Sequence, residues 1–236
     1  MQPFLRKLNI QVVVPALNEA GNIGDLVTEL LSQQINGVTV VDNGSEDETG
    51  PIAAAAGAHV VVEPRRGYGY ACQAGTVAAI AAGAEIIVYI DGDYSSLPAE
   101  IARLTEPVLQ DGVDLALGSR VLGDIEPGAM PPHQRFGNWL SSRLMGWLYG
   151  IPVTDLSPYR AIKTELLQTL AMQEMTFGWP TEMMVKAAKR GASLQEVPVT
   201  WAVRRTGRSK VSGTVRGTIL AAYYILGVTI KYAWKR

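Results

Sequence analysis

The chain of 236 residues contains one cysteine, Cys72, so it cannot form an internal disulfide. This fits a reducing compartment, and we expect a cytoplasmic location. Only two histidines are present, His59 and His133, and their wide separation in the sequence argues against a zinc site. The apolar run in the N-terminal stretch MQPFLRKLNIQVVVP is too short for a secretory signal peptide.

Signatures of two nucleotide-binding classes are absent or incomplete. No Gly-Lys-Ser/Thr phosphate loop occurs, so nothing supports a nucleoside triphosphatase. The stretch GYGYAC resembles half of a dinucleotide fingerprint, but Cys72 replaces its last glycine or alanine, and it follows the third predicted strand. A nicotinamide-dependent oxidoreductase that uses Asp91 for the ribose is an alternative, although it leaves Asp93 and the basic C-terminal region unexplained.

Acidic residues are missing from the whole segment after Glu196. That segment carries eight basic residues, namely Arg204, Arg205, Arg208, Lys210, Arg216, Lys231, Lys235 and Arg236. Since the chain holds 21 basic and 22 acidic residues in all, its first 196 residues carry 13 basic against 22 acidic, a charge of −9. A basic end on an acidic body indicates an anionic partner, such as phosphate groups, lipid headgroups or nucleic acid.

The apolar stretch ILAAYYILGVTI, residues 219–230, is 12 residues long, whereas a membrane-spanning helix needs about 20. It is followed by basic and aromatic residues that favour a headgroup interface, namely Lys231, Tyr232, Trp234, Lys235 and Arg236. We predict a C-terminal helix within residues 212–236 that lies at the surface of an anionic bilayer. The alternative is a helix packed on the domain or in a dimer.

Apolar and polar patterns alternate along the rest of the chain. Strands are predicted at NIQVVVP, VTVVD, HVVVE, IIVYID and DLALG, with helical patterns between them. This alternation predicts an α/β fold with a mostly parallel sheet covered by helices on both faces. With 47% hydrophobic residues, the chain can bury one sizeable core.

Polar side chains follow each predicted strand, namely Asn18 and Glu19, Asp42, Arg65 and Arg66, Asp91 and Asp93, and Arg120. In open parallel sheets the ligand binds beyond the carboxyl ends of the strands. Five strands that bring polar residues to one edge therefore indicate a binding site there.

Asp91 and Asp93 stand two positions apart in IIVYIDGDYSSLP, directly after a buried strand, where their charges repel. One explanation is a simple Asp-Gly turn. The other is a divalent cation bound by both carboxylates, since hard oxygen ligands suit Mg²⁺ or Mn²⁺. An EF-hand is excluded, because Ser96 and Ala102 stand where its loop needs glycine and glutamate.

Eight motifs occur in order along the chain: VVVPALNEAGNI, VVDNGSEDET, RRGYGYACQAG, YIDGDYSSLPAEI, GSR, TDLSPYRAI, GWPTEMMVKAAKRG and RRTGRSKVSGT. Together they resemble family 2 glycosyltransferases, in particular the branch of dolichol-phosphate mannose synthases and related polyprenyl-phosphate sugar transferases. The resemblance implies a GT-A fold with a Rossmann-like sheet, a nucleotide-sugar donor, a divalent metal and inversion at the anomeric carbon. It favours the metal explanation for Asp91 and Asp93.

The resemblance also implies a donor site. Its residues are Pro15, Asn18 and Glu19 in a first nucleotide-contacting loop, Asp42 at the base, Arg66 and Gly67 in the same pocket, and Asp91 near the ribose and metal. Asp93 is the direct metal ligand through the diphosphate. Related synthases often carry Gln two residues later, where this chain has Ser95, a poorer ligand, so metal binding depends more on water.

The resemblance also implies that Arg120 and Arg135 hold phosphates, and that Arg205, Arg208 and Lys210 contact a diphosphate or an acceptor phosphate. It further points to residues of two motifs, namely Asp155 and Arg160 in TDLSPYR, and Trp179 and Glu182 in GWPTEM. Simpler explanations stay open for some of them. Asp155 has an alternative as the cap of a following helix. Arg135 and Arg143 could instead be solvated charges on a helix, and we prefer this explanation for Arg143. Met183 and Met184 are expected in the core.

We therefore expect transfer of a hexose from a donor such as UDP-glucose or GDP-mannose to a polyprenyl phosphate. A phosphate acceptor is already anionic at neutral pH, whereas an alcohol needs a carboxylate base. The alternatives are a soluble hydroxyl acceptor and a non-catalytic nucleotide-sugar-binding protein. We expect a catalytic domain over residues 1–211, with a nucleotide-sugar half to residue 120 and an acceptor half after it. We expect no nucleic acid partner and a peripheral position at the inner face of the membrane; a homo-oligomer stays open.

Overall fold

The computed structural model describes residues 8–206 and 215–233. Within these residues, seven strands form one sheet in the order β3-β2-β1-β4-β6-β5-β7. The strands are β1 (Ile10–Ala16), β2 (Gly37–Asp42), β3 (His59–Val62), β4 (Ile86–Tyr89), β5 (Leu115–Ser119), β6 (Arg160–Lys163) and β7 (Leu194–Pro198). Neighbouring strands are parallel except where β6 pairs antiparallel with β4 and β5. The predicted mostly parallel α/β sheet is confirmed.

The five predicted strands correspond to β1 to β5, while β6 and β7 were not predicted. Both are short, with the sequences RAIK and LQEVP, and lack the continuous apolar runs of the central strands. Because β6 runs against its neighbours, it begins at the edge where the parallel strands end. The residues that precede β6 therefore lie at the same edge as the residues that follow β1, β4 and β5.

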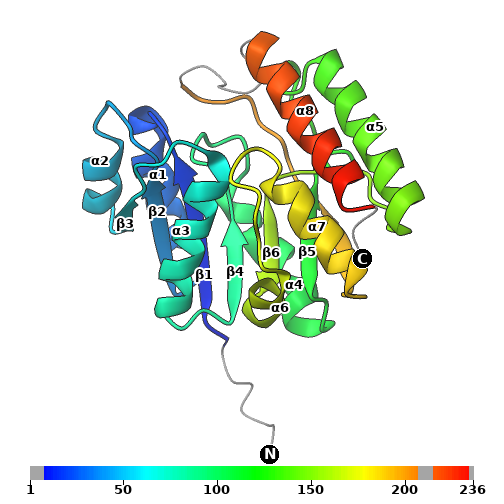
Figure 1. Ribbon diagram of the computed structural model, residues 1–236. Coiled ribbons are helices and arrows are strands. Elements are labelled where there is room, and N and C mark those ends of the chain that lie inside the picture. The colour runs from blue at the N-terminus through cyan, green and yellow to red at the C-terminus, as the bar shows by residue number, and fades with distance from the viewer. Residues whose placement is uncertain (1–7, 207–214, 234–236) are drawn as a thin grey trace, which may run out of the picture.

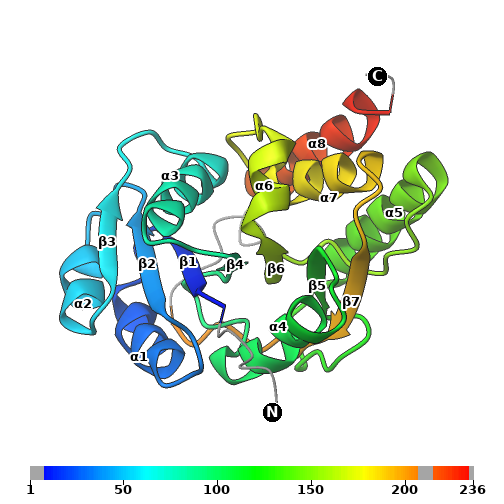
Figure 2. The same ribbon diagram turned by 90° about the horizontal axis from the view of Figure 1, so that it is seen from below.

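Helices cover both faces of the sheet (Figures 1 and 2). Their bounds are α1 (Ala20–Leu31), α2 (Thr49–Ala55), α3 (Tyr68–Ala81), α4 (Ile101–Gln110), α5 (Pro132–Tyr149), α6 (Thr164–Leu170), α7 (Trp179–Lys189) and α8 (Val215–Lys231). Helices α1 and α4 pack on one face, and α3, α6 and α7 on the other (Figure 2). Alternate residues of β1 enter the two cores, with Val12 and Val14 in the first and Val13 in the second.

Helices α5 and α8 lie side by side next to α7, outside the layer that α3, α6 and α7 form on the sheet (Figure 1). Val228 of α8 and Tyr232, directly after this helix, are buried against the domain, while Tyr223 and Ile230 of α8 are exposed. The described part of α8 is thus packed along one side and open along another. Among the residues that the structure describes, no helix combines the length and the apolar character needed to cross a bilayer.

Candidate active site

The loops that follow β1 and β2 are bound to each other. Asn18 has a positive φ of 51°, a conformation that asparagine tolerates better than most residues. Its backbone N–H donates to Ser45 Oγ at 3.0 Å, and its side-chain oxygen accepts from the N–H of Glu46 at 2.8 Å. Asp42, at the end of β2, accepts from the N–H of Ser45 at 2.7 Å. The structure therefore brings Asn18 and Asp42 to one rim.

Arg66 and Gly67 join this rim from the loop after β3. The N–H of Gly67 donates to Asn43 Oδ1 at 2.9 Å, and the exposed Arg66 lies 3.7 Å from Glu46. A Cβ on Gly67 would come within 2.4 Å of the carbonyl oxygen of Met175. The glycines of GYGYAC thus allow close approach of a neighbouring segment, which accounts for them without a dinucleotide.

Asp91 and Asp93 follow β4 and have different surroundings. Tyr68 Oη donates to Asp91 Oδ1 at 3.0 Å. Burial, and then the charge of Asp93, raise the pKa of Asp91 to about 7. Asp93 Oδ1 accepts from both the N–H and the hydroxyl of Ser95, at 3.0 and 2.5 Å. Ser95 therefore holds Asp93 in place in this arrangement.

The two aspartates fit a divalent ion that is shared with a substrate. Within residues 8–206 and 215–233, no three His, Cys, Asp or Glu side chains come close enough to form a metal cage. Mg²⁺ is commonly held by only one or two carboxylates, with phosphate oxygens and water as the other ligands. Asp91 and Asp93 suit an ion of that kind.

Arg120 and Asp155 form a compact ion pair on the other side of the site. Asp155 Oδ2 accepts from the backbone N–H and Nε of Arg120 at 2.7 and 2.8 Å, and Oδ1 accepts from NH2 at 2.6 Å. The Asp155 side chain is fully buried, and the guanidinium lies 4.7 Å from the ring centre of Trp201. Residues 156–159 form no helix, so the helix-cap alternative for Asp155 is wrong.

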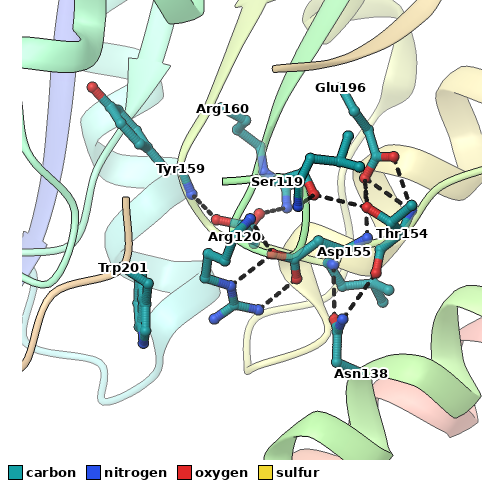
Figure 3. A network of polar contacts seen from close by, with 12 residues as sticks. Ser119, Arg120, Asn138, Thr154, Asp155, Tyr159, Arg160, Glu196 and Trp201 are labelled. Carbon is teal, nitrogen blue, oxygen red and sulfur yellow. Dashed lines mark hydrogen bonds and ion pairs between the residues drawn. The ribbon is translucent and has the colours of Figure 1, made fainter. Parts of the chain in front are cut away.

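The loop that carries Asp155 is held from two directions (Figure 3). Glu196 of β7 accepts from the N–H of Thr154 at 2.9 Å, and from the Thr154 hydroxyl and the N–H of Asp155 at 3.0 Å. Asn138 of α5 donates to the carbonyl oxygen of Thr154 and accepts from the N–H of Leu156. Burial raises the pKa of Glu196, and the hydrogen bonds that Glu196 accepts from Thr154 and Asp155 offset this rise only in part. Sequence reasoning missed both Glu196 and Asn138.

A segment after β7 crosses the carboxyl ends of the strands; we call residues 201–206 the crossing segment. Arg204 NH1 lies 2.9 Å from Glu19 Oε1, and NH2 lies 2.8 Å from Asp93 Oδ2. Arg205 stacks over Tyr94, 3.5 Å from the ring centre. The motif analysis singled out Arg205 but not Arg204. Arg208 and Lys210, predicted to hold phosphates, lie outside the described residues.

Glu182 makes no contact with Asn18, Asp42 or Asp91. Its carboxylate is completely buried and accepts from the N–H groups of Gln173 and Glu174, from Tyr232 Oη at 2.5 Å and from Lys186 Nζ at 2.8 Å. With both oxygens engaged, Glu182 anchors α8 and the segment before α7. A direct catalytic part for it, as expected from the motif, has no support in this geometry.

Other predicted residues also differ in their placement. Arg160 is buried and donates to the carbonyl oxygens of Ser157 and Pro180, so it stabilises the loop before β6. Trp179 is buried in the second core. Arg135 is exposed at the start of α5 and donates to the carbonyl oxygen of Met130 at 3.2 Å. Its expected role in holding a phosphate therefore stays a prediction.

Comparison with known proteins supports the motif analysis. The model of the family described as glycosyl transferase family 2 matches residues 11–185. An uncharacterized glycosyltransferase of Mycobacterium bovis is 36% identical over 215 residues, which cover 90% of this chain and 94% of the relative. A dolichyl-phosphate hexose transferase of Haloferax volcanii is 31% identical over 215 residues, which cover 90% of each chain.

The fold has a close counterpart among crystal structures. That of glucosyl-3-phosphoglycerate synthase from Mycobacterium tuberculosis, in complex with Mn²⁺, UDP and phosphoglyceric acid, is 22% identical with a TM-score of 0.78. The similarity covers 97% of this chain and 80% of that one, which confirms the GT-A fold. By its sequence and its fold, the chain belongs to glycosyl transferase family 2 and is a glycosyltransferase.

Proposed function

We propose that the enzyme transfers a hexose, with inversion, from a nucleotide-diphosphate sugar to a polyprenyl phosphate, with Mg²⁺ or Mn²⁺ bound together with the donor. The donor site lies along the rim formed by the loops after β1 to β4. The Mn²⁺ and UDP in the structurally similar synthase support this part of the proposal. The acceptor assignment depends on the geometry around Arg120.

The observation that carries the acceptor assignment is the ion pair between Arg120 and Asp155. If the acceptor were an alcohol, Asp155 is the acidic residue that we would assign as its base. Its two oxygens are instead bound to Arg120, and its side chain is fully buried. This arrangement presents a fixed cation and lacks a free base at Asp155. It suits an acceptor that is already an anion, as a phosphate monoester is near pH 7.

The chemistry then follows from charge. Departure of the nucleoside diphosphate leaves negative charge on the leaving group, which a divalent ion bound at Asp91 and Asp93 would stabilise. Arg120 would hold the acceptor phosphate beside the sugar and offset repulsion between the two anions. Asp155 fixes the plane of the guanidinium by its paired contacts, so that Arg120 meets the phosphate in one orientation.

An apolar groove beside this ion pair suits the isoprenoid chain. Its volume is about 680 Å³. Its walls are mostly apolar, with Leu140, Leu144, Trp147, Pro152 and Val153, and they also include Ser142, Arg143, Gly146 and Thr154. Thr154 directly precedes Asp155, so the groove opens within one residue of the proposed phosphate site. The relative described as a dolichyl-phosphate hexose transferase supports an acceptor of this class.

The outer faces of α5 and α8 fit a contact with the membrane that supplies such a lipid. Phe136, Trp139, Trp147 and Tyr223 are each more than half exposed, at 62%, 54%, 80% and 71%. No acidic residue occurs between Glu126 and Asp155 or after Glu196. Exposed aromatic side chains on a surface without negative charge favour an anionic lipid interface.

Asp155→Asn tests the acceptor assignment. If the acceptor is a phosphate, the substitution should slow transfer modestly, on the order of ten-fold, because only the orientation of Arg120 is weakened. Loss of a true base should instead cost about 10²–10⁴-fold. The rates should be measured with a short polyprenyl phosphate, with Asp111→Asn at an exposed position as the matched control. A loss in the larger range, with an unchanged melting temperature, would favour a hydroxyl acceptor.

A soluble hydroxyl acceptor is the second candidate, and one observation favours it. The structurally similar synthase was crystallised with phosphoglyceric acid, which is not a lipid. The groove and the exposed aromatic side chains have no evident part in such a reaction. Activity on phosphoglyceric acid that exceeds activity on a polyprenyl phosphate would support this candidate.

A further inference from the structure

Arg204 holds two acidic residues of the donor site at once. Its NH1 donates to Glu19 Oε1 and Oε2 at 2.9 and 3.2 Å, and its NH2 donates to Asp93 Oδ2 at 2.8 Å. The Arg204 side chain is 17% exposed, Glu19 6% and Asp93 16%. These are charge-assisted hydrogen bonds in a partly desolvated place, where they are stronger than on an open surface.

The contact occupies the part of Asp93 that a metal ion would need. The other oxygen of Asp93, Oδ1, already accepts two hydrogen bonds from Ser95. Oδ2 faces Arg204, so an ion that binds this oxygen competes with the guanidinium for the same lone pairs. One oxygen of Asp93 therefore accepts from Ser95, and the other accepts from Arg204.

The residues on either side of Arg204 are bound to the loops that carry Asp93 and Glu19. The N–H of Ala202 donates to the carbonyl oxygen of Ser95 at 2.9 Å, next to the loop of Asp93. On the other side, Thr206 Oγ1 donates to Asn22 Oδ1 at 2.9 Å, and Asn22 Nδ2 donates to Glu19 Oε2 at 2.9 Å. The crossing segment is thus bound to both loops that Arg204 connects.

We propose that Arg204 is the resident cation of the metal site. Without ligands, it offsets the charges of Asp93 and Glu19 and keeps the site in shape, and a divalent ion binds Asp93 only when Arg204 leaves it. The diphosphate of the donor adds negative charge that Arg204 can contact in place of Asp93, so that a metal ion then binds Asp93 more readily. This inference rests on the metal use proposed above and does not depend on the acceptor.

Metal and nucleotide should consequently bind as a pair. In the wild-type protein, Mn²⁺ alone must displace Arg204 and should bind weakly, whereas a nucleoside diphosphate should strengthen Mn²⁺ binding. By linkage, Mn²⁺ must strengthen nucleotide binding by the same factor. The competition therefore lowers the share of enzyme molecules that hold a metal ion when no donor is present.

The experiment compares Mn²⁺ binding to the full-length wild type and to Arg204→Gln, measured by calorimetry and by electron paramagnetic resonance of free Mn²⁺. Without nucleotide, Arg204→Gln should bind Mn²⁺ about ten-fold or more tightly, because the competing charge is gone. With saturating UDP or GDP, the two proteins should differ less. Arg190→Gln, at the end of α7 and bound to the carbonyl oxygen of Thr169, is the matched control and should match the wild type.

Arg204→Lys is a second variant, which tests the inference even if Arg204→Gln does not fold. Lysine keeps the charge but has a single head group that cannot reach both carboxylates as the guanidinium does. Its Mn²⁺ affinity should lie between those of the wild type and Arg204→Gln. Equal or weaker Mn²⁺ binding by folded Arg204→Gln would overturn the inference. Absence of Mn²⁺ binding in every variant, with either nucleotide, would overturn the metal proposal and this inference with it.

Discussion

At the scale of single residues, Glu196 should control how well Arg120 is positioned. Glu196→Ala leaves the N–H groups of Thr154 and Asp155 without their acceptor, and a buried unpaired group costs about 1–3 kcal/mol. We expect kcat/KM for the acceptor to fall on the order of ten-fold or more, while nucleotide binding is unchanged. Glu196→Gln keeps one oxygen for these bonds and should restore most of the rate.

Steady-state kinetics with saturating donor, together with UDP and GDP titrations, check this prediction. Glu165→Ala, at an exposed position of α6, is the control for removal of a glutamate. If nucleotide binding falls together with the acceptor parameters, or if Glu196→Gln is as impaired as Glu196→Ala, then Glu196 supports the fold in general and does not specifically position Arg120.

At the scale of elements, Glu182 should stabilise the packing of α8 on α7. Burial raises its pKa, but hydrogen bonds from Lys186, Tyr232 and two backbone N–H groups outweigh burial, so the pKa of Glu182 is lowered from 4.5. A carboxyl whose pKa is lowered by folding adds stability above its unfolded pKa, and this stability is lost as the pH falls through the folded pKa.

Glu182→Gln should therefore lower the free energy of unfolding at pH 7, and the deficit should shrink as the pH falls below about 4.5. Urea unfolding of both proteins at neutral and acidic pH measures this difference. The rate of transfer per folded molecule should change little at neutral pH. A large loss of rate with an unchanged free energy of unfolding would instead support a direct catalytic role for Glu182.

The same pair of helices provides a test of membrane contact. Replacing the exposed Trp147 of α5 and Tyr223 of α8 by serine should reduce flotation with anionic liposomes at low salt, because both side chains favour the headgroup region. Truncation of α8 would expose its buried residues, so point substitutions are the cleaner change. Val77→Ser, an exposed apolar position on α3, is the control. If the wild-type protein does not float with such liposomes, the membrane proposal is wrong.

At the scale of the whole molecule, sequence periodicity predicts the central sheet well and its far edge poorly. The strands β1, β2 and β4 consist mostly of apolar residues, because helices cover both of their faces. β7 has the sequence LQEVP, and the carboxylate of its Glu196 accepts a hydrogen bond from a loop instead of lying in the core. The strand therefore lacks the apolar pattern by which strands are predicted. The four residues of β6 contain no pattern that predicts its antiparallel direction relative to β4 and β5.

The candidate site likewise contains some residues that the sequence predicts and others that it does not. That Asp42, Asp91 and Asp93 lie at one edge was predictable, because the carboxyl ends of parallel strands converge at the same edge of a sheet. Glu196 and Arg204 were not singled out, because their partners lie 41 and 111 residues away in the sequence. Contacts over such distances depend on the tertiary arrangement, and no local spacing encodes them.

The most direct test of the proposed function is a competition among acceptors for one labelled donor. The purified protein, with Mn²⁺ and a UDP- or GDP-hexose, should be given a short polyprenyl phosphate, the matching polyprenol and phosphoglyceric acid in equal amounts. We predict that the sugar appears on the polyprenyl phosphate, and that EDTA stops the transfer. Transfer to the polyprenol or to phosphoglyceric acid, with the polyprenyl phosphate unmodified, would contradict the assignment of Arg120 and Asp155 as the binding site of a lipid phosphate.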